Sequence, residues 1–203
     1  MADAEKQPEE SCRKTLKLYR LLLEKYSELI NEREKRTIGE IKSLVNSDDL
    51  TVQSVLGDLV EEGYSFERDY PKAAEKAFAF AREEIEFVEP DIPLNYWLSP
   101  KELLTEKVGD DEDLALFLCS VLLGLGDENA EVVIAELDDL STHAFVITEL
   151  EGRFYILDPS QNHYFDEFSG RKEEVLLKYS FRGSKIRKFL YRFNSKNYEQ
   201  FFE

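Results

Sequence analysis

The hydrophobic pattern of the chain changes character twice, and each change marks a different kind of element. Residues 12–34 place apolar side chains at alternating spacings of four and three, as in an amphipathic helix. Residues 114–126 carry no charge, which predicts a helix that is buried on every side. From residue 131 the period shortens to two, as in half-buried strands. The pattern therefore predicts helices first, then one buried helix, then a sheet.

The apolar stripe of the first helix has two interpretations. It consists of Cys12, Leu16, Tyr19, Leu23, Tyr26 and Ile30. A heptad-like stripe can form a dimerising coiled coil, but this one is shorter than the three to four heptads that define such a coil. We therefore favour a helix docked on its own domain, and a homodimer through the N-terminal helix stays open. Residues 1–10 are polar and acidic, so we expect a disordered tail there.

Four shorter helices are expected between the first helix and the buried one. Pro71 opens one of them, and Ser99 caps another. Their ranges are 38–45, 52–62, 72–84 and 100–105. The first two resemble a helix-turn-helix, but residues 52–62 contain no Lys or Arg, which a DNA-reading helix requires. We interpret them as a helical cap on the main domain.

Three strands are expected after the buried helix. Residues 131–137, 142–150 and 153–157 alternate, and Glu151-Gly152 fits a tight hairpin turn. Residues 172–178 fit either a helix or a strand, and alternating aromatics predict a final strand near residue 191.

These elements define the predicted fold class and domains. The class is α+β, with a buried central helix against an antiparallel sheet and a helical N-terminal extension. The predicted organisation is a tail over residues 1–10, an extension over 11–65 and an α+β domain over 66–203.

Composition narrows the classes of partner. The net charge of −17 argues against nucleic acid and anionic membranes, because both require a basic face. The longest uncharged apolar run is too short to span a bilayer, and the first ten residues lack a secretory signal. The two cysteines, Cys12 and Cys119, do not indicate a disulfide framework. We expect a cytoplasmic protein without a cofactor or metal.

The buried helix begins with four consecutive acids, residues 110–113. Asp110 can act as the N-cap, with Asp113 reaching back as in a capping box. A helix N-terminus at the edge of a core favours a negative charge and is a common place for a nucleophile. The residue at that place is Asp111.

His143 and Asp158 lie on the two strands of the predicted hairpin. Pairing about Glu151-Gly152 places Asp158 opposite Phe145, one diagonal step from His143 on the same face. An imidazole and a carboxylate at that spacing can form the base and the orienting acid of a catalytic triad.

These segments, in this order, resemble the transglutaminase-like superfamily of papain-related Cys-His-Asp enzymes. The similarity covers about residues 66–162 and includes Tyr96-Trp97, the acidic start of the buried helix, Thr142-His143-Ala144 and Leu157-Asp158-Pro159. The resemblance implies a papain-like core with His143 as base, Asp158 as orienting acid, and Asp111 in place of the nucleophilic cysteine.

That departure from the family decides the expected function. A carboxylate is a poor nucleophile toward an amide, and Cys119 lies about 12 Å further along the same helix at ~1.5 Å per residue. We therefore expect a catalytically inactive, transglutaminase-like protein that binds a peptide or protein in its cleft.

Three alternatives remain open. The chain could be an amide hydrolase or acyltransferase with unrecognised chemistry. It could use a divalent metal held by acids of the site, although carboxylates on successive helix positions do not converge. It could also work through its N-terminal helix alone. Two further features are not assigned to the site. We expect His163 to be exposed to solvent or packed in its loop, and we expect the basic stretch 181–193 to pair with acidic residues of the same chain.

Overall fold

A computed structural model describes residues 3–202, and the side chains of residues 12–202. The helices are α1 (Asp3–Arg33), α2 (Ile38–Leu44), α3 (Leu50–Leu59), α4 (Phe66–Glu84), α5 (Pro100–Glu106), α6 (Asp111–Gly124) and α7 (Lys172–Lys178). The strands are β1 (Glu86–Phe87), β2 (Val108–Gly109), β3 (Glu131–Leu137), β4 (Thr142–Leu150), β5 (Arg153–Leu157), β6 (Ser169–Gly170), β7 (Ile186–Phe193) and β8 (Tyr198–Gln200).

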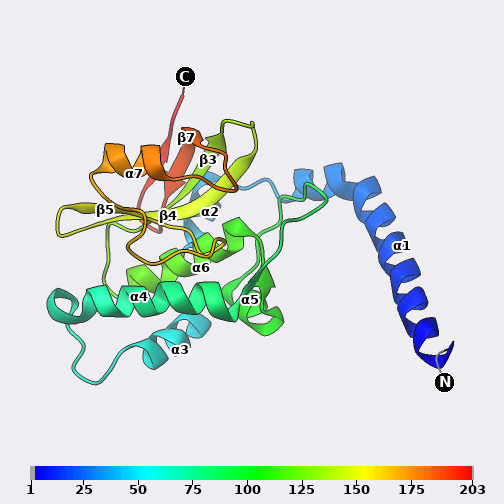
Figure 1. Cartoon of the computed structure of the whole chain (residues 1–203), viewed down its shortest axis with the longest axis horizontal. Helices are drawn as coiled ribbons and strands as arrows, with labels where there is room; N and C mark the ends of the chain where they lie inside the picture. The colour runs from blue at the N-terminus through cyan, green and yellow to red at the C-terminus, as the bar shows by residue number, and fades with distance from the viewer. Residues whose placement is uncertain (1–2, 203) are drawn as a thin grey trace. The chain divides into compact units, whose positions relative to one another are not determined.

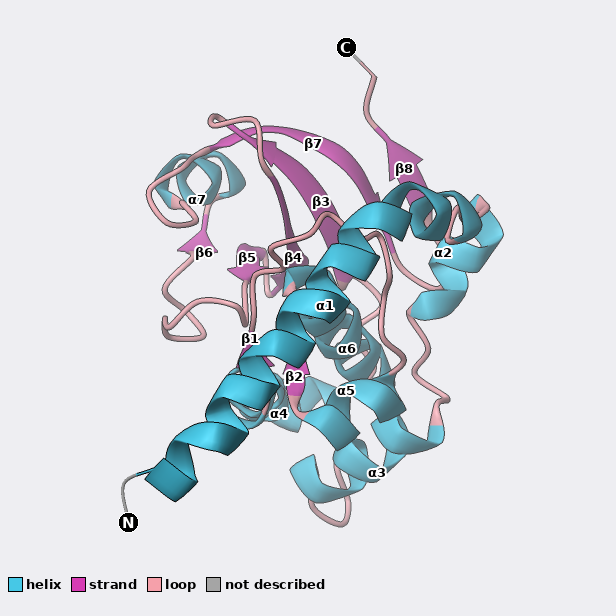
Figure 2. Cartoon of the chain, turned by 90° about the vertical axis from the view of Figure 1, so that its right-hand side faces the viewer, coloured by secondary structure: helices cyan, strands magenta, loops and turns pink. Residues whose placement is uncertain are grey.

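Six antiparallel strands form the main sheet in the order β6-β5-β4-β3-β7-β8. The long strands β3, β4 and β7 run side by side (Figure 2). The three expected strands are confirmed with their bounds, and the strand predicted near residue 191 is confirmed as β7, although it is not the final one, because β8 follows it. The sheet is more than a simple meander, because β7 pairs with β3 on the side away from β4.

The buried helix α6 lies on one face of the sheet, with α4 beyond it (Figure 1). Its residues 113–122 are buried, as the uncharged run predicts. On the other face α7 covers a second apolar cluster that includes Phe145, Ile156 and Tyr179. Residues 172–178, for which the sequence allows either a helix or a strand, therefore form a helix. The observed architecture is the expected α+β class, with a central helix against an antiparallel sheet.

The β4–β5 hairpin fixes the register on which the site depends. Glu151 and Gly152 have φ values of 52° and 74°, and both central residues of a type I′ turn need positive φ. The turn pairs Val146 with Leu157, so Asp158 follows opposite Phe145 as predicted.

The contacts of the chain divide it differently from the predicted boundary at residue 65. One unit contains Met1–Lys35 and Pro90–Tyr96, and the other contains Arg36–Glu89 and Trp97–Glu203. Residues 36–65 join the sheet-bearing unit because α3 buries four apolar side chains in the same core as α6. A Cβ atom on Gly124 of α6 would lie 2.4 Å from Leu56 Cδ1 of α3, so these helices touch closely.

Residues 3–10, where a disordered tail is predicted, belong to α1 in the structure, while residues 1–2 lie outside the described part. The tail itself stays a prediction. One expected helix start is corrected. Helix α4 begins at Phe66, five residues before Pro71, because Asp69 and Ser65 exchange hydrogen bonds across its first turn.

No helix within residues 3–202 is long and apolar enough to cross a membrane.

Because α3 shares the core of the sheet, truncating its buried side should destabilise the whole unit. We expect Leu56→Ala to lower the free energy of unfolding by about 2–5 kcal/mol, as for other buried leucines. Chemical denaturation should show the loss in the near-UV circular dichroism of the aromatic core. Leu50→Ala on the same helix is the control, since Leu50 is 86% exposed. A separate early transition that leaves the near-UV signal unchanged would instead make α3 part of an independent extension.

Candidate functional site

Three elements bring their side chains together at one buried point: the start of α6, strand β4 and the residue after β5. His143 lies between two carboxylates. Its Nδ1 is 2.6 Å from Asp111 Oδ2, and its Nε2 is 3.0 Å from Asp158 Oδ2. The backbone N–H of Ala144 also donates to Asp111 Oδ2 at 2.7 Å. The structure therefore places together all three residues that the sequence singled out.

The Asp158 carboxylate is fully buried and accepts hydrogen bonds at both oxygens. Ser160 donates its N–H and its hydroxyl to Oδ1, at 3.1 and 2.5 Å. Gln161 and the hydroxyl of Tyr179 each donate to Oδ2 at 2.6 Å. Burial alone would raise the pKa of Asp158, but the bonds and charge from His143, with those from Ser160 and Tyr179, hold this pKa below its usual value. The carboxylate is therefore ionised at neutral pH.

These two carboxylates set the charge of His143. Burial disfavours the imidazolium, but hydrogen bonds to Asp111 and Asp158 and their charges outweigh it and raise the pKa of His143 to about 9. Both ring nitrogens face carboxylate oxygens, so both carry protons and donate. The ring is a buried cation without a free lone pair at neutral pH.

The other acids at the start of α6 have structural partners. Asp110 and Asp113 form the predicted capping box, and Asp113 also accepts the backbone N–H of Leu98 at 2.7 Å. Glu112 accepts the indole N–H of Trp97 at 2.6 Å. Burial and then repulsion from neighbouring acids raise the pKa of Glu112 to about 8 and that of Asp113 to about 7. The edge of the site thus holds carboxyl groups that keep protons near neutral pH.

Phe181 covers the imidazole. Its ring stacks on that of His143 with 3.7 Å between centroids and 13° between planes. Backbone bonds between Phe181 and Ser184 close a tight turn in which Arg182 and Gly183 have positive φ. Arg182 contacts the Phe181 ring and pairs with Glu89. As a result His143 is 1% exposed, whereas the Asp111 side chain keeps 20% of its surface.

The remaining candidates lie outside this site. Cys119 is fully buried in α6, and burial raises the pKa of its thiol. His163 packs in its loop between Phe78 and Phe168, and its Nε2 has no hydrogen-bond partner among the described residues.

The basic stretch 181–193 pairs with the chain's own acids, as the sequence analysis expected. Arg182 pairs with Glu89, Arg187 with Glu136, and Arg192 with Glu131 and Glu199.

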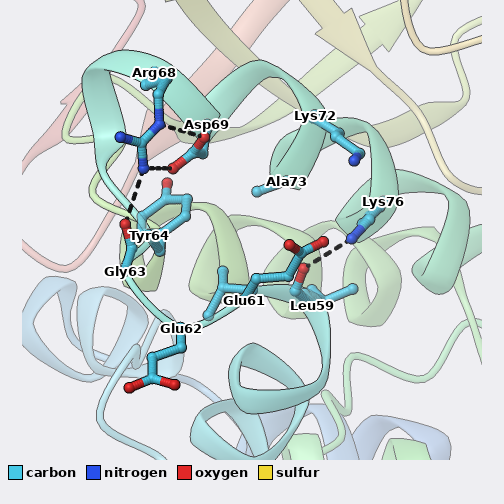
Figure 3. Close-up of a pocket in the computed structure, with 11 residues that line it drawn as sticks. Leu59, Glu61, Glu62, Gly63, Tyr64, Arg68, Asp69, Lys72, Ala73 and Lys76 are labelled. Carbon is cyan, nitrogen blue, oxygen red and sulfur yellow. Dashed lines mark hydrogen bonds and ion pairs between the residues drawn. The ribbon is translucent and has the colours of Figure 1, made fainter.

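Two other kinds of site, a metal-binding cluster and the hollow beside α4, are separate questions from the residues around His143. Within residues 12–202 there is no group of three His, Cys, Asp or Glu side chains that could hold a metal ion. A hollow of about 150 Å³ lies between the end of α3 and the start of α4. Figure 3 shows residues that line it, and none of them belongs to the site around His143.

Sequence reasoning missed four partners of the site: Ser160, Gln161, Tyr179 and Phe181. A signal existed for Ser160 and Gln161, because an Asp followed by Pro and Ser readily accepts hydrogen bonds from the turn after it. Tyr179 and Phe181 follow α7 in the chain, and no local pattern links Tyr179 to Asp158, 21 residues earlier, or Phe181 to His143, 38 residues earlier.

Comparison with known proteins agrees with this architecture. Residues 95–182, less than half of the chain, match the family described as the CEP76 peptidase-like domain. Comparison with curated protein sequences gives no significant match.

Among solved structures, EGTA-treated LapG of Legionella pneumophila is similar. It has a TM-score of 0.51 and 18% identity over 83% of this chain and 87% of that one. Calcium-bound LapG has the same TM-score and identity over 81% and 88%. Identities this low show the fold alone, and the chain has a papain-like α+β fold.

Removing the charge of Asp111 should lower the pKa of His143. Asn can still accept the Ala144 N–H, so we expect Asp111→Asn to lower this pKa from about 9 by about one to three pH units. A pH titration of the ring carbons by NMR would measure it. Asp138→Asn, which removes an exposed carboxylate, should leave the pKa unchanged.

The same titration has a signature in stability. The folded-state pKa of His143 lies above its ordinary 6.5, so its stabilisation is fully present below about pH 6.5 and is lost as the pH rises through 9. This loss should shrink in Asp111→Asn. If His143 of the unmodified protein titrates near 6.5, the bridged imidazolium is excluded.

Proposed function

We propose that this chain is a catalytically inactive papain-like protein in which Asp111 occupies the place of the nucleophile, and that it acts by binding a peptide or protein in its cleft. The observation that carries the proposal is the double engagement of His143. Each ring nitrogen faces a carboxylate oxygen, at 2.6 and 3.0 Å.

The inactivity follows from which atoms of the site carry protons at neutral pH. A cysteine nucleophile needs an imidazole that can take its proton and then give it to the leaving group. Here the imidazolium has a pKa of about 9 and donates to both neighbours, so it has no lone pair to offer at neutral pH. Asp111 cannot replace the thiolate, because a carboxylate attacking an amide would form an unstable anhydride. Cys119 lies fully buried further along α6.

The proposal of a ligand rests on what stays accessible. Phe181 covers the imidazole, but Asp110, Asp111 and Glu112 at the start of α6 remain partly exposed. Their carboxyl oxygens can accept hydrogen bonds from peptide N–H groups. Trp97 beside them donates its indole N–H to Glu112. A ligand would therefore lie along the start of α6 and next to Trp97.

Restoring the thiol tests whether a complete triad environment surrounds residue 111. We expect Asp111→Cys, with Cys12→Ser and Cys119→Ala, to react with iodoacetamide well below pH 8, because the helix N-terminus and His143 favour the thiolate. The rate should be followed against pH by mass spectrometry.

The matched control adds His143→Ala, which should slow the reaction. A thiol that titrates near ~8.5 and does not respond to His143 would show that residue 111 is not a nucleophile position. Turnover of a peptide by the unmodified protein would contradict inactivity directly.

Trp97 provides a direct test of the ligand, because it is the single tryptophan of the chain. We expect a synthetic pool of hexapeptides to shift the NMR signal of its indole N–H, since the proposed ligand contacts Glu112, the carboxyl group that accepts this N–H. Asp111→Arg should weaken the effect by filling the cleft edge, whereas Asp138→Arg, an exposed site elsewhere, should not. An indole signal that stays in place at the highest soluble concentration of the pool would overturn peptide binding here.

A further inference from the structure

Helix α1 carries a concentration of exposed apolar side chains. Eight large hydrophobic residues of α1 are 40% to 61% exposed: Leu16, Leu18, Tyr19, Leu21, Leu22, Leu23, Tyr26 and Leu29. We call this set the leucine face. Contiguous exposed apolar surface on a protein usually marks an interaction site, because leaving it in water is costly.

The leucine face borders an open groove within its own unit. Residues 90–94 run beside α1 and are held there by Arg20, which pairs with Asp91 at 3.1 Å, and by Asn31, which donates to the Pro93 carbonyl at 2.9 Å. A groove of about 800 Å³ remains between them. Its apolar lining consists of Leu16, Tyr19, Leu21, Leu23, Ile92 and Leu94. The groove has room for several large side chains from another helix.

We propose that the apolar stripe of α1 from Cys12 to Ile30, which shares Leu16, Tyr19, Leu23 and Tyr26 with the leucine face, pairs with the same stripe of a second copy of this chain in an antiparallel two-helix interface. The apolar stripe from Cys12 to Ile30 advances by four, three, four, three and four residues. This series of spacings is the same in both directions, so the stripe matches its own reverse. A two-fold dimer needs such self-complementarity.

We place the two-fold axis at the level of residue 21, the midpoint of the stripe. Three kinds of residue pair then form across the interface, and each occurs twice. Cys12 meets Ile30 of the partner subunit, and Leu16 meets Tyr26 of the partner subunit. Tyr19 meets Leu23 of the partner subunit. Each pair thus joins the two alternating positions of the stripe, as antiparallel coiled coils do.

The charges of α1 select the antiparallel direction. Residues 13–20 contain four basic side chains and no acidic one: Arg13, Lys14, Lys17 and Arg20. Residues 24–34 contain four acids and two bases. Parallel helices would place the basic segment against itself, whereas antiparallel helices place it beside Glu24 and Glu28 of the partner subunit. Opposite charges along an interface favour that orientation, and like charges disfavour the other.

The oligomeric state of the full chain tests the pairing. We expect light scattering after size exclusion to give the mass of a dimer, and Leu16→Glu with Leu23→Glu to give a monomer. Leu177→Glu on α7, also at an exposed leucine, should remain dimeric. Near-UV circular dichroism should be equal in all three proteins. A monomer of the unmodified chain at every concentration would overturn the proposal, and α1 would then cover part of its own chain.

A cysteine crosslink tests the direction. Ile30→Cys should form an intermolecular disulfide with Cys12 of the partner subunit under mild oxidation, because the pairing places these positions within about 7 Å. The unmodified chain is the control. Its two Cys12 residues would be ~27 Å apart, at ~1.5 Å per residue over eighteen residues, so no dimer should be crosslinked. Cys119 is buried and cannot contribute. A Cys12–Cys12 crosslink in the unmodified chain would show parallel helices and overturn the antiparallel interface. Neither experiment depends on the state of His143.

Discussion

The bridge from Asp111 through His143 to Asp158 is the constraint on which the arrangement of the site depends. It joins the first turn of α6 to the middle of the sheet through one aromatic ring that is 1% exposed. A buried cation is stable only when its charge and both its protons find partners. That requirement fixes the N-terminus of α6, the position of His143 on β4 and the end of β5 relative to one another within hydrogen-bond distance.

The same bridge shows that a triad-like geometry does not by itself determine whether His143 can act as a base. Three residues in a base-and-acid arrangement normally suggest catalysis, but the direction of the protons decides what the arrangement can do. In this chain two acceptors flank the imidazole, so the ring is a donor on both sides. The Phe181 ring then excludes water from the cation. On the proposed function, the site keeps the positions of a triad while its central residue does not act as a base.

Much of the fold and part of the site were predictable from local rules. The Glu151-Gly152 turn determines the register of β4 and β5, and that register alone brings His143 to Asp158. The capping box of Asp110 and Asp113 locates the start of α6, because it satisfies the first backbone N–H groups of the helix.

Contacts between distant segments were not predictable in this way. Pairing of β7 with β3 and the hydrogen bond from Tyr179 to Asp158 depend on tertiary packing rather than on local sequence. The predicted boundary at residue 65 rests on local pattern in the same way, and the contacts divide the chain elsewhere. The polar pattern of residues 36–65 suggests an extension, but the apolar side chains of α3 find their partners on α6, more than fifty residues later.

The proposed replacement of cysteine by Asp111 also has a structural logic of its own. One oxygen of the Asp111 carboxylate, Oδ2, accepts both from the imidazolium of His143 and from the Ala144 N–H. It therefore joins the helix to the backbone of β4 as well as to the His143 ring, and its charge lies at the positive end of the helix dipole. On the proposed function, the residue that removes the chemistry is the one that fastens helix to sheet. The exposed surface at the start of α6 would then bind a peptide or protein without catalysing a reaction.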